Sequence, residues 1–464
     1  MAETQVDPHV VHVAHVAQPV RPNGRVQTVR PEELFFSTTD RRGIIRSGNS
    51  VFSRISGYPT TDLVGAPHNL VRHPDMPAGA FRIMWERLQS GRPMAAYVQN
   101  LARDGSAYWV FATVTPHGDG FLSVRMAPAG PLYGPARSLY ETVRQYERDA
   151  VLRSGMSRAQ AAEAGAARAE SLLHGLGYRS YEEFMLDALP GEVAVRGSLV
   201  RTTFARPQAS GPMATLLDAA GELDRRLEGL VAALEPYRDL VRALESSAET
   251  VIQHAGRLET SVLAAQRASD GVATTAPVLL NVATVMAGPM SAAVTALHEL
   301  SPDLVDLRAA VAWLRFRIGL ARLHVEMVAA FAAEAVDGLA PDQTLPEIPG
   351  LCDTLADGVA EMAREAGRVN QRLRESAAKV AAAGQFLDEF RRFLGQWRIL
   401  VGRHRQGGAL ADLVAPIDDQ LDAGHEQLDH LRELARSCHG AVVPLDTAAL
   451  EHAVQQIRDA SGYR

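Results

Sequence analysis

The stretch Arg72-His73-Pro74-Asp75-Met76-Pro77 is the most informative part of this chain. Each of its two prolines fixes its own φ angle and pushes the residue before it out of the helical region. Arg72, His73 and Asp75 are therefore presented from a short rigid segment. We expect a rigid polar segment of this kind to bind a ligand.

Strand and turn signals flank this segment on both sides. We predict five short strands, at 34–36, 43–45, 95–101, 107–115 and 120–126. Residues 50–90 are predicted to be helical or irregular, because turn residues recur throughout them. The residues expected to supply the apolar side of the sheet are Tyr97, Trp109, Phe111 and Phe121.

The region around the proline segment resembles the sensory PAS domain of bacterial aerotaxis receptors, a flavin-carrying branch of a large ligand-binding fold. The resemblance rests on 36–40, 49–52, 55–58, 65–77, Phe81 to Trp85, Asn100, Asp104-Gly105, Tyr108-Trp109-Val110 and Ser123-Val124-Arg125. It implies an α+β PAS fold over residues 30–128, in which a five-stranded antiparallel sheet carries helices on one face. FAD would lie between the sheet and these helices.

The resemblance also implies a set of cofactor-binding residues, namely Asn49, Arg72, His73, Asp75, Trp85 and Asn100. Arg72 would neutralise a phosphate or the charge of the reduced flavin. Asn100 offers both a donor and an acceptor to a ring edge, and Trp85 would lie near the isoalloxazine. Met94 stands where family members commonly place tryptophan after Gly-x-Pro, so one aromatic wall of the pocket is lost.

The alternatives to a flavin that remain open are a ligand-free scaffold, and haem or another small molecule. In a ligand-free PAS scaffold, Arg72, His73 and Asp75 would form an internal hydrogen-bonded brace, with Trp85 as a core residue. In a haem b sensor, one of the domain's three histidines, His68, His73 and His117, would be the axial ligand. Covalent c-type haem is excluded because no Cys-x-x-Cys-His occurs.

Strand signals end near residue 135, and residues 129–205 are predicted to form a helical linker region. Ser157-x-x-Gln160 and Ser180-x-x-Glu183 are capping boxes that would start helices near 158 and 181. The glycines of Gly175-Leu176-Gly177 would separate these two helices.

A seven-residue repeat follows the loop at 206–212. Its first set of apolar positions is Leu216, Leu223, Leu230, Tyr237, Leu244, Val251 and Leu258, and its second set is Leu227, Leu234, Val241, Ala248, Ala255 and Val262. Heptads of this kind predict a left-handed coiled-coil seam, which Pro236 should bend. The apolar stripe needs a partner, either another segment of the chain or a second subunit. Because PAS domains pair readily within their family, we expect a homodimer through both the PAS domain and the coiled coil.

Further apolar registers predict that residues 213–464 form an elongated all-α coiled-coil or helical bundle. These registers include Leu304, Val311, Ile318 and Val325, then Val359, Leu373, Val380, Leu387, Leu394 and Val401, and finally Val414, Leu421 and Leu428. Turn-rich gaps near 338–350 and 402–408 would fold the helices back on one another. The uncharged stretch 271–297 is predicted to be two packed helices with a break at Gly288-Pro289, so a membrane span is not expected.

Composition narrows the function. The chain has 464 residues and a net charge of −7, which gives no reason to expect a nucleic-acid partner. Its two cysteines are too few for a disulfide framework, so we expect a reducing cytoplasm. Lys379 is the single lysine and is followed by valine, so no phosphate-binding Gly-Lys-Ser/Thr loop exists. No zinc, dinucleotide or triad signature is present, and we expect no enzyme activity. Residues 1–29, with His9, His12 and His15, are predicted to be a disordered tail.

The sequence gives one indication of the chain's output, in residues 314–334. Residues 314–334 have a cadence dimly similar to a chemoreceptor tip but lack its Asn- and Glu-rich character. We therefore expect a helical surface for an unknown signalling protein rather than direct docking of a kinase and adaptor. Arg315, Arg317 and Arg322 are expected on a solvated helix face, and Phe316, Leu320 and Phe331 in the bundle core.

Overall fold

The computed structural model describes residues 20–200, 204–338, 345–403, 409–440, 443 and 445–462. Residues 1–19 of the predicted tail, with its three histidines, lie outside the described residues. The chain divides into two units, one holding residues up to 129 together with 133–169, and the other holding 130–132 and 170 onward. The first unit therefore includes helices that the sequence analysis assigned to the linker region.

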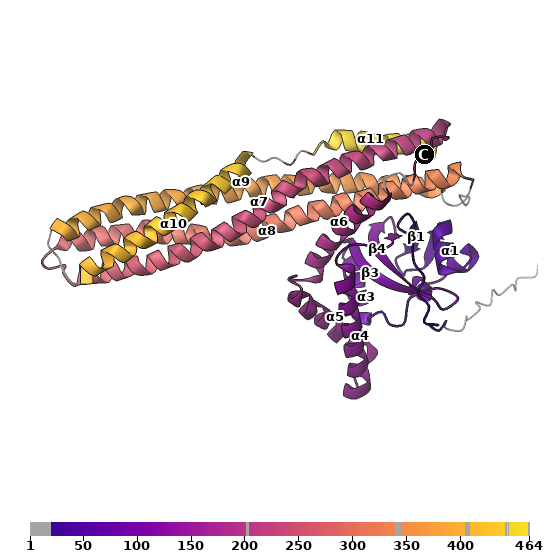
Figure 1. The fold of residues 1–464 in the computed structure, drawn as a ribbon, viewed down its shortest axis with the longest axis horizontal. Helices are drawn as coiled ribbons and strands as arrows, with labels where there is room; N and C mark the ends of the chain where they lie inside the picture. The colour runs from indigo at the N-terminus through magenta and orange to yellow at the C-terminus, as the bar shows by residue number, and fades with distance from the viewer. Residues whose placement is uncertain are drawn as a thin grey trace, which may run out of the picture. The chain divides into compact units, whose positions relative to one another are not determined.

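The first unit is built on a five-stranded antiparallel sheet, as predicted (Figure 1). Its strands are β1 (Leu34–Asp40), β2 (Ile45–Gly48), β3 (Met94–Leu101), β4 (Ala107–His117) and β5 (Gly120–Met126), in the order β2-β1-β5-β4-β3. A two-residue turn at 118–119 joins β4 to β5, and His117 pairs with Gly120 across it. The turn signals in the sequence therefore mark real strand ends.

The two faces of the sheet carry different aromatic residues. Tyr97 of β3 lies opposite Phe111 of β4 and, with Trp109, faces α4 (Tyr133–Ser154), where both rings lie 5.8 Å from the ring of Tyr133. Phe121 pairs with Pro116, which has the opposite parity to Phe111 in β4, so Phe121 lies on the other face. The prediction that all four aromatics share one side is wrong for Phe121, because the two-residue turn sets the register of β5.

Short helices cover the face that carries Phe121. They are α1 (Ser50–Ser56), α2 (Thr60–Leu63), the 3₁₀ helix η1 (His68–Val71) and α3 (Ala78–Gln89). The core between these helices and the sheet includes Phe35, Phe52, Val71, Tyr108 and Val110. The proline segment runs from η1 to α3 along β3, where the His73 N–H donates to the Gln99 carbonyl at 3.3 Å.

The predicted capping boxes start the next helices, α5 (Arg158–Gly175) and α6 (Tyr181–Val200). At α5 the box is reciprocal, because the Gln160 N–H donates to Ser157 Oγ and the Ser157 N–H donates to Gln160 Oε1. At α6 only half of it forms. The Glu183 N–H donates to Ser180 Oγ, but the Glu183 carboxylate accepts from the Arg179 N–H instead.

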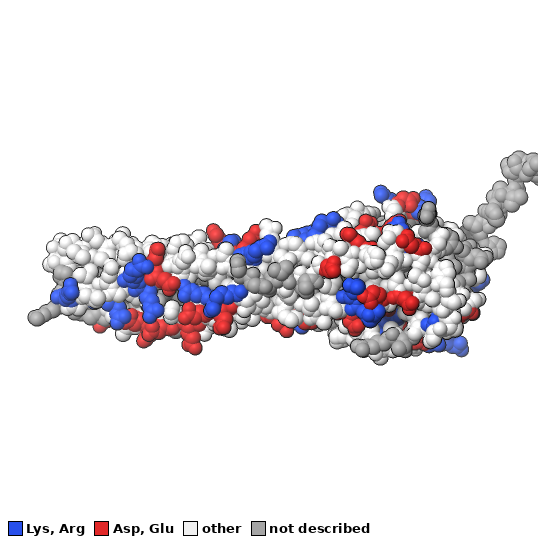
Figure 2. All heavy atoms as spheres, turned by 90° about the horizontal axis from the view of Figure 1, so that it is seen from above, with Lys and Arg blue, Asp and Glu red and all other residues white. Residues whose placement is uncertain are grey.

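Long helices make up the second unit, as the heptads predicted. They are α7 (Gly211–Asp270), α8 (Pro277–Val336), α9 (Ile348–Arg403), α10 (Ala409–Gly440) and α11 (Thr447–Ser461), with a 3₁₀ turn η2 at Leu345–Glu347. α8 packs between α7 and α9 (Figure 1). The two C-terminal helices, α10 and α11, each contact both α7 and α9, and α6 packs on α8. On the face in Figure 2, acidic and basic side chains are interspersed along the helices, which is typical of solvated surfaces.

The α7 seam is covered by helices of the same chain. Nearly all of its heptad positions are buried, whereas Leu230 and Tyr237 are only half-buried. Pro236 lies inside α7 without ending it. The sequence left open whether another segment of the chain or a second subunit covers this apolar seam. In the structure, helices of the same chain cover it.

The predicted break at Gly288-Pro289 is wrong, because α8 runs through Pro289 and Pro302 as one helix. The register of Leu304 and Leu307 continues upstream without a shift, through the buried residues Leu300, Leu297, Ala293, Met290, Met286, Ala283 and Leu279. Packing along this stripe outweighs the missing proline hydrogen bonds. By length and composition alone, α8 could cross a membrane. Its most apolar 18-residue stretch has a mean hydropathy of 1.5, and 33% of that stretch is buried inside the protein.

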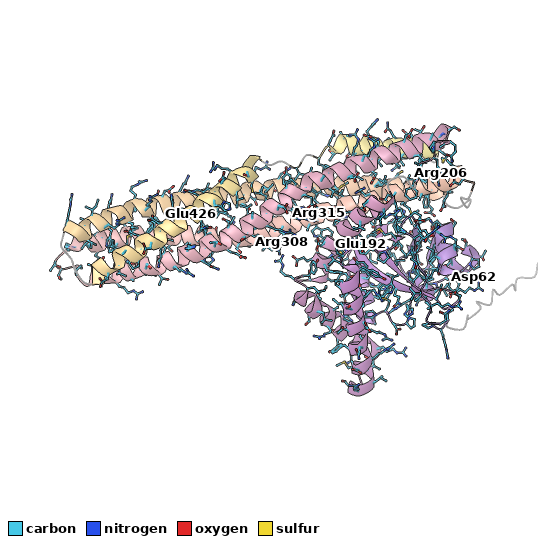
Figure 3. All side chains as sticks on the ribbon, in the orientation of Figure 1. Asp62, Glu192, Arg206, Arg308, Arg315 and Glu426 are labelled. Atoms are coloured by element: carbon cyan, nitrogen blue, oxygen red, sulfur yellow. The ribbon has the colours of Figure 1, made fainter. Side chains whose placement is uncertain are left out.

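The arginines expected on a solvated face of α8 are instead partnered inside the second unit. Arg322 is only 5% exposed, and its Nε donates to Asp224 Oδ1 at 2.8 Å. A guanidinium nitrogen of Arg315, which is labelled in Figure 3, lies 2.8 Å from a carboxylate oxygen of Glu235 in α7. Arg317 is also largely buried, near Glu361. The expectation failed because helices surround α8, whereas Phe316, Leu320 and Phe331 are buried as predicted.

Candidate ligand cavity

A cavity of about 400 Å³ lies between the sheet and α3 in the first unit. This volume falls within the range of small-molecule sites. Its apolar wall includes Phe81, Met84, Trp85, Leu88, Val98, Val114 and Phe121. Its polar wall includes Ser37, Thr39, Arg42, His68, Asn69, Arg72, Asn100, Ser123 and Arg125. The lining contains three arginines and no carboxylate among the described residues.

The proline segment brings two predicted site residues together at this cavity. Arg72 forms an isolated antiparallel bridge with Asn100 of β3, so the two residues lie side by side at the sheet edge. The Arg72 guanidinium lies 3.9 Å from the centre of the Phe81 ring. Burial lowers the pKa of Arg72, whereas the negative charge of Glu147 acts in the opposite direction. Arg72 is thus a cavity-lining cation with a partly compensated charge.

Asn100 is the predicted residue best placed to hold a ligand. It is 3% exposed and lines the cavity, and its Nδ2 makes no hydrogen bond of normal geometry in the described part of the chain. The hydroxyl of its cross-strand neighbour Tyr108, which is also buried without such a bond, is the acceptor group next to it. Ser123 of β5 also lines the cavity, and its buried Oγ likewise has no partner in the described part of the chain. Because buried polar groups are nearly always hydrogen-bonded in proteins, these two atoms indicate a polar group in the cavity.

Trp85, which the resemblance places near a flavin ring, lines the cavity from α3. Its ring makes an edge contact with Phe121, with centroids 5.9 Å apart. A Cβ at Gly43 would come within 3.3 Å of the indole, and Gly43 also has a φ of +80°. The turn between β1 and β2 therefore requires glycine at this position.

The other three predicted site residues do not line this cavity. Asn49 caps α1, with its Oδ1 accepting from the Phe52 N–H at 3.2 Å and its Nδ2 donating to the Leu34 carbonyl at 3.1 Å. The Nδ1 of His73 accepts from the Asp75 N–H at 3.1 Å, and burial lowers the pKa of His73. Asp75 forms an ion pair with Arg148 of α4. His73 and Asp75 thus hold the segment that carries Arg72, whereas Asn49 ties the start of α1 to β1.

Glu147 was missed by the sequence analysis, although it connects the cavity helix to α4. Its carboxylate accepts from the Ala78 N–H at 2.9 Å and from the Gly79 N–H at 2.8 Å, at the first turn of α3. A carboxylate at this place satisfies backbone donors and complements the helix dipole. The helix that carries Phe81, Met84 and Trp85 is therefore tied directly to α4. No local pattern marks this contact, because its partners are 68 and 69 positions apart.

Arg125 and His68 form a second missed pair within the cavity wall. One Arg125 N–H donates to His68 Nε2 at 2.6 Å, and another to Ser37 Oγ at 3.0 Å. Burial and the charge of Arg125 lower the pKa of His68 well below its usual value. From the sequence, both residues belong to the resemblance and His68 is also a candidate haem ligand, but no pattern pairs the two.

The histidine positions do not favour axial ligation of haem. His68 is the one candidate of the three that lines the cavity, and its Nε2 already accepts from Arg125. The Nδ1 of His73 is occupied by the Asp75 N–H, and His117 ends β4 outside the cavity lining. Among the described residues no cluster of histidine, cysteine or acidic side chains could hold a metal ion.

Comparison with known proteins agrees with this architecture. Residues 46–121 match the PAS fold family. The aerotaxis receptor of Escherichia coli (strain K12) is 38% identical over 136 residues, 27% of this chain and 27% of that receptor. The nitrogen fixation regulatory protein of Klebsiella pneumoniae is 31% identical over 88 residues, 19% of this chain and 18% of that protein.

Solved PAS and LOV structures are also similar to this chain. The PAS domain of a protein from Colwellia psychrerythraea is 21% identical, with a TM-score of 0.18, and covers 20% of this chain and 85% of that one. The Rhodobacter sphaeroides LOV protein is 16% identical, with a TM-score of 0.20, and covers 31% and 89%. The N-terminal part of this chain is a PAS domain, similar to that of an aerotaxis receptor. The matched stretches span about a quarter or less of the two curated relatives.

Proposed function

We propose that this protein is a signal-transduction sensor whose PAS domain binds FAD and reads redox state or oxygen. The observation that carries the proposal is the cavity beside α3, which presents two buried polar atoms without partners, Asn100 Nδ2 and Ser123 Oγ. The likeness to the aerotaxis receptor supports a sensory role for the domain. The function of the remainder of the chain is part of the same proposal.

The residues that line the cavity fit a flavin. Trp85, Phe121 and Val98 offer flat or apolar contact to a ring, and Asn100 offers an amide to a ring edge. Arg72 and Arg125 offer positive charge. A bound flavin would supply reversible electron acceptance, with a change in charge and protonation. The domain has no cysteine, so any reaction in the cavity would proceed without a thiol.

Two physical connections would carry a change in the cavity to α4. Asn100 lies in β3, and Tyr97 of the same strand contacts Tyr133 of α4 from the opposite face of the sheet. The second connection is Glu147, which holds the first turn of α3. A shift of either cavity wall would therefore change the contacts of α4. From α4 the chain continues through α5 into the second unit.

The second unit would present a helical surface to an unknown signalling protein. We expect no enzyme activity, because the similar proteins that name a role are a receptor and a regulator. A cytoplasmic location and a homodimer complete the proposal. A second copy would bind mainly through the PAS domain, because the apolar α7 seam is already covered by the same chain.

The absorbance spectrum of the purified full-length chain tests the proposal. A flavin spectrum, with FAD identified after heat release, supports it. Asn100→Ala removes the amide and should lower cofactor occupancy or shift its reduction potential, since a lost buried hydrogen bond costs about 1–3 kcal/mol. Trp85→Ala should also lower occupancy, by loss of wall contact.

A matched control is Gln89→Ala, at the last residue of α3 and outside the cavity lining. A colourless protein that also fails to take up added FAD would refute the flavin proposal and favour the ligand-free scaffold. An intense Soret band instead would favour haem.

A further inference from the structure

Arg125 is a buried cation without an acidic partner. It is 5% exposed, and its two hydrogen bonds go to the neutral groups Ser37 Oγ and His68 Nε2. Within the described part of the chain no carboxylate lies in ion-pair distance of its guanidinium. Burial lowers the pKa of Arg125 to about 10, so it remains charged at neutral pH. An uncompensated buried charge is costly, and proteins normally pair it.

His68 holds this guanidinium in place rather than neutralising it. An arginine only donates, so His68 Nε2 must accept and the proton of the neutral ring lies on Nδ1. The imidazole is stacked on Phe52, with ring centroids 5.8 Å apart and planes 9° apart. The Arg125 Cζ lies 5.5 Å from the centre of the same Phe52 ring. Two hydrogen bonds and the Phe52 ring therefore hold the guanidinium in place.

The surroundings of Arg125 differ from those of Arg72. Arg72 stacks on Phe81, and the negative charge of Glu147 raises the pKa of Arg72 against the effect of burial. For Arg125 burial also lowers the pKa, and the group that acts in the opposite direction is the phenol of Tyr108 rather than a carboxylate. Ser123, two residues before Arg125 on the same face of β5, presents the unpartnered Oγ described above. The β5 side of the cavity therefore has a free positive charge next to an unpaired hydroxyl.

We propose that Arg125, positioned by His68 and Ser37, recognises a negatively charged oxygen of the ligand on the β5 side of the cavity. This inference deepens the proposed function and rests on it for the identity of the ligand. In a flavin the oxygen belongs either to a phosphate or to the reduced ring. Both sources present the same chemistry to a guanidinium.

Binding measurements on the full-length chain, stripped of copurified flavin, test the inference. FAD and riboflavin are titrated, oxidised and after reduction, into the wild type, Arg125→Gln, Arg125→Lys and the control Arg103→Gln. Arg103 is an exposed arginine of the same domain that pairs with Asp62 and does not line the cavity. Arg125→Gln should bind about ten- to a hundredfold more weakly, because a hydrogen bond to a charged group is lost. Arg125→Lys should stay within a few fold of the wild type, and Arg103→Gln should match it.

The two flavins identify which oxygen is recognised. A loss seen with FAD but not with riboflavin assigns a phosphate, and a loss confined to the reduced flavins assigns the ring. Arg125→Gln chains that melt like the wild type and bind every probe equally well would overturn the inference. So would a folded Arg125→Lys chain as weak as Arg125→Gln.

A second measurement separates this inference from the proposed function. If the wild type takes up neither flavin, the flavin proposal fails, and melting temperatures are then compared in inorganic phosphate and in malonate. Stabilisation of the wild type but not of Arg125→Gln by either anion would uphold anion recognition. Equal stabilisation of both chains would overturn it.

Discussion

Replacing Glu147 by glutamine should loosen the start of α3. The carboxylate is 3% exposed and accepts two backbone hydrogen bonds, from Ala78 N and Gly79 N. A hydrogen bond to a charged acceptor contributes about 1.5–3 kcal/mol. Glutamine keeps one acceptor oxygen, loses the charge at the helix N-terminus, and turns an amide N–H₂ toward a backbone N–H. We expect a cost of about 2–3 kcal/mol in local stability.

Packing leaves the structure little room to relax around this substitution. A Cβ at Gly165 of α5 would clash with the Glu147 carboxylate, and a Cβ at Gly79 would clash with the backbone of α5. The side chain at 147 is thus confined between α3 and α5. A glutamine there cannot easily turn away to find another partner.

Hydrogen exchange followed by mass spectrometry measures this effect locally. Peptides covering the start of α3 should exchange about 30- to 150-fold faster in Glu147→Gln than in the wild type, because opening follows the local free energy. Glu163→Gln is the matched control, since Glu163 is 70% exposed and its ion pair with Arg82 spans 3.7 Å. That variant should exchange like the wild type. Protection of α3 within about threefold of the wild type in Glu147→Gln would refute the double cap.

Three further predictions concern pH, the buried ion pair and assembly. The pKa of His68 is lower in the folded than in the unfolded chain, so the free energy of unfolding should be highest above about pH 6.5 and should fall as the pH drops toward the folded pKa. Urea titrations at several pH values should show a weaker pH dependence of stability in His68→Gln. An unchanged pH dependence would contradict a lowered pKa for His68. Arg196→Met strands Glu326, its partner at 2.7 Å, and should cost about 3–5 kcal/mol by far-UV circular dichroism in urea. Burial raises the pKa of Glu326, so this cost should shrink at acidic pH, and Arg196→Met with Glu326→Met should recover much of it; a double variant as unstable as the single one would contradict the pairing. Light scattering should show a wild-type dimer at tens of micromolar, and Leu244→Asp, in the buried α7 seam, should lower helical content without changing the mass; a monomeric wild type would refute the dimer.

Local patterns in the sequence predicted most of the secondary structure. Turn residues, alternation and capping boxes act over a few neighbouring residues, so the last three strands and the starts of α5 and α6 could be located without tertiary information. The first strand was predicted too short, at 34–36 instead of Leu34–Asp40, and the second was predicted at 43–45, whereas β2 is Ile45–Gly48. The heptads predicted the long helices for the same reason. The register that continues through Met286 and Met290 is also present in the sequence, and its apolar stripe outweighs the helix-breaking signal of Pro289.

The resemblance to aerotaxis receptors located part of the candidate site. It identified Arg72, Trp85 and Asn100, which all line the cavity, because the proline segment and α3 hold them in a recognisable order. It also named Asn49, His73 and Asp75. The side chains of Asn49 and His73 accept hydrogen bonds from backbone N–H groups, and Asp75 pairs with Arg148 of α4. Sequence similarity does not separate residues that contact a ligand from residues that support them.

Only the tertiary structure decided which distant residues meet. The register of β5 places Phe121 and Arg125 on the cavity face, and helices around α8 bury Arg322. The pairing of Arg125 with His68 and of Glu147 with α3 spans 57 to 69 positions of chain. Periodicity reports the face of an element, whereas the cost of burying a charge is set by the neighbours that folding brings to it. The sequence therefore determined the elements of this protein, and their packing decided where its buried charges lie.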